Sequence, residues 1–205
     1  LSPMLRDTPV LRDKVNDKSR NSGNTILQKI FPGGHVTMVG ANSPSSLASR
    51  PIRILLADEI DRYPATAGNE GDPLLLAGKR LATFWNKKEV CVSTPTNKET
   101  SRIAVEFEHS TQEEWNVPCP ACGAFTPLLW ANIVFDRDKL DEIGCTCPAC
   151  GVVSSETEWK EQFRKGKFVA AHPERKVRGF HLNALASLFV EWREIVEKFL
   201  TANEE

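Results

Sequence analysis

The sequence lacks most of the motifs by which an enzyme class is recognised. It contains no Gly-x-x-x-x-Gly-Lys-Ser/Thr phosphate-binding loop, no Gly-x-Gly-x-x-Gly dinucleotide fingerprint, no His-Glu-x-x-His zinc motif and no nucleophile elbow. The 4 histidines show no spacing typical of a metal site or a catalytic triad. The 205 residues therefore do not include the phosphate cradle that a complete P-loop hydrolase needs.

Long apolar runs and an excess of charge of one sign are also missing. No stretch is long enough to cross a bilayer, and no signal peptide is present. The formal net charge of −1 gives no global signature of nucleic-acid binding, although Lys and Arg dominate residues 164–178. The chain starts at Leu1 without an initiator methionine, and we expect it to be a piece of a longer protein.

The most informative stretch is residues 52–61, Ile-Arg-Ile-Leu-Leu-Ala-Asp-Glu-Ile-Asp. A short run that is apolar on both faces predicts a strand inside a covered parallel sheet. The run ends in Asp58 and Glu59, at the strand end where open α/β sheets hold ligands. In nucleoside triphosphate hydrolysis, Asp58 would hold Mg²⁺ and Glu59 would orient or deprotonate the attacking water. A solvated acidic turn after an ordinary strand is the alternative.

A second polar group follows the next predicted strand. The pattern predicts a helix over residues 74–85, capped by Asp72, and a buried strand over residues 88–92 that ends in Ser93, Thr94, Pro95 and Thr96. Strand, helix and strand in this order predict a parallel crossover, which places these hydroxyls beside Asp58 and Glu59. Such a turn can sense the γ-phosphate in motor ATPases, although Ser, Thr and Pro also favour ordinary turns.

The strongest motif is Cys-Pro-Ala-Cys-Gly, which occurs at residues 119–123 and again at residues 147–151. Each copy aims two thiolates at one point, and two copies about 25 residues apart predict a closed tetrahedral site for structural Zn²⁺. The predicted ligands are Cys119, Cys122, Cys147 and Cys150. Loss of the metal, or oxidation of the cysteines, is the alternative. Cys145 is a spare thiol, and the roles of Cys145 and Arg50 stay open.

Together with the family resemblance given below, these features predict an α/β fold of the P-loop NTPase type, with a mainly parallel sheet and an added zinc ribbon. We expect an ATPase-core segment over residues 1–112, the zinc ribbon over residues 113–154 and an α/β tail over residues 155–205. A turn at residues 21–24 is expected to precede a hairpin with strands at residues 25–31 and 35–39. Two short strands over residues 168–171 and 177–182 and a last helix over residues 190–202 complete the expectation.

Taken in order, the motifs resemble the large terminase subunit of tailed double-stranded-DNA phages, in its lambda-like branch. The matching pieces are Ser-Arg-Pro-Ile-Arg-Ile-Leu-Leu-Ala-Asp-Glu-Ile-Asp-Arg-Tyr-Pro, Glu-Gly-Asp-Pro, Ser-Thr-Pro-Thr, the two cysteine motifs, and Arg-Gly-Phe-His-Leu-Asn-Ala-Leu. The resemblance covers nearly the whole chain. It identifies Asp58 and Glu59 with the Walker B pair, and Ser93–Thr96 with the motif that couples hydrolysis to DNA movement.

The resemblance implies a motor that uses ATP and Mg²⁺ to drive viral DNA into a procapsid, in a protein that also cuts DNA concatemers. It implies double-stranded DNA, a small terminase subunit and the portal as partners, a homo-oligomeric motor, and a place in the host cytoplasm without a membrane. The Walker A loop would precede Leu1 and the nuclease residues would follow Glu205, so the fragment alone is expected to be inactive. A helicase-type ATPase half and a zinc-ribbon module that binds nucleic acid on an α/β scaffold are the alternatives.

Overall fold

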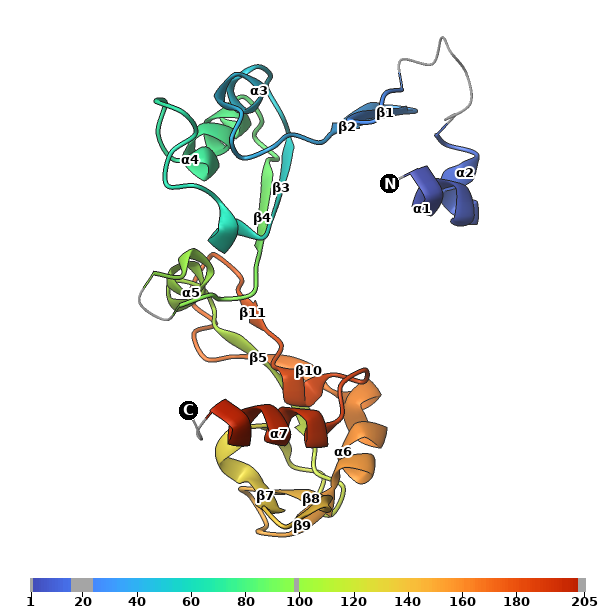
Figure 1. The fold of residues 1–205 in the computed structure, drawn as a ribbon. Helices are drawn as coiled ribbons and strands as arrows, with labels where there is room; N and C mark the ends of the chain where they lie inside the picture. The colour runs from blue at the N-terminus through green and yellow to red at the C-terminus, as the bar shows by residue number, and fades with distance from the viewer. Residues whose placement is uncertain (1, 16–23, 98–99, 203–205) are drawn as a thin grey trace. The chain divides into compact units, whose positions relative to one another are not determined.

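The computed structural model describes residues 2–15, 24–97 and 100–202, so the turn predicted over residues 21–24 lies mostly outside the described residues. The chain forms two compact units, Leu1–Ile103 and Ala104–Glu205, and each is described by itself (Figure 1). The three-part division expected from the sequence stays a prediction. No helix among the described residues is long and apolar enough to span a membrane.

The first unit contains short elements joined by turns. Its helices and strands are α1 (Ser2–Asp7), α2 (Pro9–Arg12), β1 (Gln28–Phe31), β2 (Gly34–Thr37), α3 (Pro44–Ala48), β3 (Ile54–Asp58), the 3-10 turn η1 (Ile60–Arg62), α4 (Pro73–Gly78), η2 (Lys79–Leu81) and β4 (Lys88–Val92). The predicted hairpin is confirmed, because β1 and β2 pair antiparallel. The helix expected over residues 74–85 is shorter than predicted. It loses α-helical geometry after Gly78, a residue that weakens helices.

The predicted parallel crossover is confirmed. Strands β3 and β4 pair in parallel, from Ile54 opposite Lys88 to Asp58 opposite Val92, and α4 lies between them in sequence. The carboxyl ends of both strands therefore meet at one edge of the sheet (Figure 1).

The expectation that β3 is covered on both faces is not met within the described residues, which cover one face only. Successive side chains of a strand point to opposite faces. Leu55 packs against a small cluster with Leu47 of α3 and Ala77 of α4, whereas Ile54 and Leu56 are 47% and 70% exposed. The mixed α/β class is confirmed. Among the described sheets only β3–β4 is wholly parallel, so a larger parallel sheet stays a prediction.

Helix α5 (Arg102–Glu108) begins with the last two residues of the first unit and continues into the second. The other elements of the second unit are β5 (Glu113–Pro118), β6 (Phe125–Pro127), η3 (Trp130–Asn132), β7 (Ile133–Asp136), β8 (Lys139–Thr146), β9 (Val153–Ser155), α6 (Glu156–Gln162), η4 (Phe163–Lys165), β10 (Lys167–Ala170), β11 (Phe180–His181), η5 (Ala184–Ala186) and α7 (Trp192–Ala202). One sheet joins β10, β5 and β11, with β6 also on β5, and a second has the order β7-β8-β9. The strand expected over residues 177–182 keeps only its last part, as β11.

The core of the second unit is built around two tryptophans. Trp159 of α6 and Trp192 of α7 are fully buried, in a cluster that includes Val117, Leu128 and Phe163. Each indole N–H has a partner, since Trp159 donates to the carbonyl of Cys145 at 3.1 Å and Trp192 to that of Leu185 at 2.9 Å. Satisfied indole donors let these large side chains be buried without leaving a polar group unpaired.

Candidate functional site

The first candidate site lies where β3 and β4 end. Asp58 is the last residue of β3, and its side chain is exposed, as is that of Glu59. Glu59 has a φ of 55°, the left-handed region that residues other than glycine seldom adopt. Its Oε2 accepts a hydrogen bond from Arg62 Nε at 3.1 Å. The predicted water-activating carboxylate is therefore paired with Arg62 in this structure.

The predicted hydroxyl turn is held by an acid for which the sequence had suggested no role. The Asp61 carboxylate accepts the Thr96 N–H at 3.0 Å and the Thr96 hydroxyl at 3.3 Å, both at Oδ2. Its other oxygen accepts the N–H of Ile103 at 2.8 Å, and the Asp61 N–H donates to Ser93 Oγ at 3.2 Å. Two of the three predicted phosphate-sensing hydroxyls are therefore bonded to Asp61.

The electrostatics of Asp61 fit this role as an acceptor. Partial burial raises its pKa, but hydrogen bonds from the Ser101 side chain, the Ile103 and Thr96 amides and the Thr96 hydroxyl outweigh burial and lower it. The signal in the sequence was the third acid of Asp58-Glu59-Ile60-Asp61. Its partners Thr96 and Ile103 lie 35 and 42 residues away, beyond the reach of local pattern.

The segment from Pro64 to Asp72 is tied down at both ends by one arginine. Arg102, the first residue of α5, donates to the carbonyl of Pro64 at 3.1 Å and lies 2.8 Å from the Asp72 carboxylate. The other Asp72 oxygen caps α4 by accepting the N–H groups of Leu74 and Leu75. The start of α5 thus contacts this segment through Arg102 and Asp61 through Ile103.

The second candidate site is a cluster of four thiols in the second unit. The Sγ atoms of Cys119, Cys122, Cys147 and Cys150 all lie within 4.8 Å of one another. The Sγ atoms of Cys119 and Cys150 are 3.9 Å apart, and so are those of Cys122 and Cys147. Both distances are far longer than the S–S bond of a disulfide. Four sulfurs at about 2.3 Å from a zinc ion would be separated by about 3.8 Å. The arrangement therefore fits a tetrahedral metal with small adjustments.

The two cysteine turns share one backbone design. The N–H of Gly123 donates to the carbonyl of Cys119 at 2.9 Å, and that of Gly151 donates to the carbonyl of Cys147 at 2.8 Å. Both glycines have positive φ, 75° and 74°, which explains the residue type that ends each motif. The expectation that these four cysteines converge is confirmed.

The thiols differ in proton affinity. Burial raises the pKa of Cys119, but hydrogen bonds from the backbone amides of Cys122 and Ala121 and from the thiols of Cys147 and Cys122 outweigh burial and lower this pKa to about 7. For Cys150 the Val152 amide lowers the pKa, while burial and the neighbouring thiols raise it to about 12. Burial and the charges of Cys147 and Cys119 raise the pKa of Cys145 to about 11. Cys145 is buried outside the four-sulfur cluster, so the cluster does not use it as a ligand.

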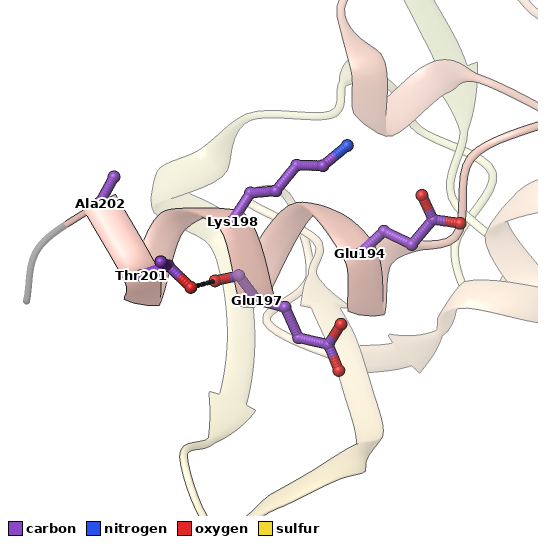
Figure 2. Close-up of a pocket in the computed structure, with 5 residues that line it drawn as sticks. All are labelled: Glu194, Glu197, Lys198, Thr201 and Ala202. Carbon is purple, nitrogen blue, oxygen red and sulfur yellow. Dashed lines mark hydrogen bonds between the residues drawn. The ribbon is translucent and has the colours of Figure 1, made fainter.

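A hollow of about 420 Å³ on the second unit offers no third site. Figure 2 shows that its lining residues, Glu194, Glu197, Lys198, Thr201 and Ala202, all come from α7. The Thr201 hydroxyl is bonded to the carbonyl of Glu197 in the same helix. One exposed helix face without a facing wall does not enclose a ligand.

Residues 1–168 match the family described as phage terminase large subunit gpA, ATPase domain. The chain belongs to this family. The terminase large subunit of Enterobacteria phage P21 is 24% identical to this chain over an aligned length of 229 residues, gaps included. The alignment covers 98% of this chain and 36% of that protein. The chain therefore spans about a third of the length of this relative. No solved structure matches the chain.

Proposed function

We propose that this chain is the part of a terminase large subunit that carries the Walker B acids and the coupling turn of a DNA-packaging ATPase. The observation that carries the proposal is the parallel pairing of β3 and β4, which brings Asp58 and Glu59 to the same sheet edge as Ser93–Thr96. Membership of the gpA ATPase-domain family supports it independently. That membership also favours a terminase over the helicase alternative.

The geometry supports a division of labour between the two acids. Bound Mg²⁺ would neutralise charge on the β- and γ-phosphates, and Asp58, exposed at the strand end, would hold it. Glu59 follows directly and would orient or deprotonate the water that attacks the γ-phosphate. The exposed apolar side chains of Ile54 and Leu56 are typical of a strand inside a larger covered sheet, as the P-loop fold has.

The four-cysteine cluster would hold one structural Zn²⁺. Thiolate ligands and a closed set of four donors are what structural zinc sites use. In the complete protein we further propose double-stranded DNA, the small terminase subunit and the portal as partners, a homo-oligomeric motor, and an associated endonuclease. These proposals rest on the family alone, because this chain spans only about a third of the length of its relative and does not cover the rest of that protein.

The test of the proposed function is Glu59→Gln in the full-length terminase. Gln has nearly the same shape but cannot take a proton, so we expect ATP turnover to fall at least ~100-fold. ATP affinity should stay within about twofold, because the metal and phosphate contacts remain. Glu70→Gln changes another exposed glutamate of the same unit and serves as the matched control. Near-normal turnover by the Glu59 variant would remove this residue from its role and refute the proposed function.

A further inference from the structure

Asp61 occupies a central position in the first unit. It lies in η1, two residues after Glu59, and its carboxylate bonds two segments that are separate in sequence. One is the Ser93–Thr96 turn after β4, and the other is the start of α5 at Ser101 and Ile103. Ser101 is 1% exposed, so the Ser101 end of this contact is sheltered from water.

We propose that Asp61 is a positioning residue that couples the hydrolysis site to α5, by holding the Ser93–Thr96 turn and the first turn of that helix on one carboxylate. The inference rests on the proposed function, since it concerns the same site. Asp61 is two residues from Glu59 along the chain, so a displacement of Glu59 also displaces Asp61. The Asp61 carboxylate then passes the displacement to Thr96 and Ile103 together.

The bonding pattern distinguishes this role from that of a phosphate sensor. The Thr96 hydroxyl donates its proton to Asp61, and Ser93 Oγ accepts the Asp61 N–H while donating to the carbonyl of Thr94. A hydroxyl has one proton to donate. Ser93 and Thr96 therefore act through Asp61 in this conformation, rather than by donating directly to a phosphate.

The carboxylate is the right group for this task. Three of the groups that face it are the N–H of Thr96, the hydroxyl of Thr96 and the N–H of Ile103, and all three donate. Both oxygens of an ionised carboxylate accept, whereas an asparagine offers one acceptor and one NH₂ donor. Asp61→Asn therefore places a donor against at least one N–H and loosens one of the two segments.

The first test measures the contact itself in this chain. Asp61→Asn should speed hydrogen exchange of the Thr96 or Ile103 amide at least ~10-fold, because the opened state becomes more populated. Asp58→Asn, the same change three residues earlier, is the matched control and should leave both rates within about twofold. Unchanged exchange at both amides in the Asp61 variant would overturn the inference.

The second test measures coupling in the full-length terminase. Asp61→Asn and Thr96→Val should each lower the length of DNA translocated per ATP hydrolysed at least ~5-fold, with ATP affinity within about twofold of the wild type. Thr96→Val removes one bond only and covers the case in which the Asp61 variant folds poorly. An unchanged length of DNA translocated per ATP would overturn the inference, even where the rates of hydrolysis and translocation both fall. The Glu59→Gln result judges the proposed function separately.

Discussion

Removing one thiol from the four-cysteine cluster gives the sharpest test of the metal site. Cys122→Ser replaces an exposed sulfur that lies 3.9 Å from Cys147. The remaining three thiols leave an open position, and the serine hydroxyl keeps its proton at neutral pH. We expect the affinity for Zn²⁺ to fall at least ~100-fold, which corresponds to ~2.7 kcal/mol of binding free energy.

The magnitude of the stability effect follows from linkage. A metal present at ~100 times its dissociation constant stabilises the folded state by ~2.7 kcal/mol. For a unit the size of Ala104–Glu205, this corresponds to ~10–20 °C in Tm. The sulfurs already lie within 4.8 Å of one another, so little of this gain is spent on rearranging the chain.

The assay is metal analysis and thermal melting of freshly purified, reduced protein, with and without a chelator. The wild type should hold one Zn²⁺ per chain and lose Tm on chelation, and Cys122→Ser should show neither property. Cys145→Ser is the matched control, because the Cys145 sulfur lies outside the cluster. No zinc in the reduced wild type, or equal loss of zinc in both variants, would refute the assignment.

Two further predictions concern the second unit. Two hydrogen bonds from Arg178, both 2.7 Å, lower the pKa of Glu113 against the effect of burial. Because the pKa is lower in the folded state than in the unfolded state, the Glu113 carboxylate stabilises the fold above the unfolded pKa of ~4.3. This contribution is lost as the pH falls further. Glu113→Gln should therefore weaken the dependence of Tm on pH between ~5 and ~3, and an unaltered dependence would contradict the role of this pair. Gly123→Ala forces a methyl group onto a backbone with a φ of 75° at a cost of ~1 kcal/mol, with no clash to add to it. It should weaken zinc binding ~5-fold in a chelator competition, whereas Gly40→Ala, which has open space and no positive φ, should not.

Local signals in the sequence predicted the parts of the fold that local chemistry decides. The strand at residues 88–92 and its parallel partner followed from short apolar runs on either side of a helix. The convergence of Cys119 and Cys150 followed from repeated spacing and from a glycine that permits each turn. In these cases the residues that specify the geometry are neighbours in sequence, or repeat one another.

Three of the misses share one physical cause, which is contact over long sequence distances. Whether Leu56 is covered depends on what packs on that face of β3, and α3 and α4 cover only the opposite face. The partners of Asp61 lie 35 and 42 residues further along, at positions where turn and helix residues look ordinary. The strand expected over residues 177–182 shrank to β11 because its pairing with β5 begins only at Phe180.

The interior of each unit is stabilised in a different way, and the difference bears on which unit can change conformation. The second has a continuous core around Trp159 and Trp192, where apolar contacts are lost together and at high cost. In the first, α3 and α4 share only a small cluster, and carboxylates fix the segments around the candidate site: Asp61 holds two of them, and Asp72 meets Arg102. Single hydrogen bonds contribute about 1 kcal/mol net, or up to ~3 when one partner is charged, so such joints open one at a time. The proposed packaging motor must change shape within each cycle of hydrolysis, and the joints around Asp61 have strengths that such a cycle can make and break.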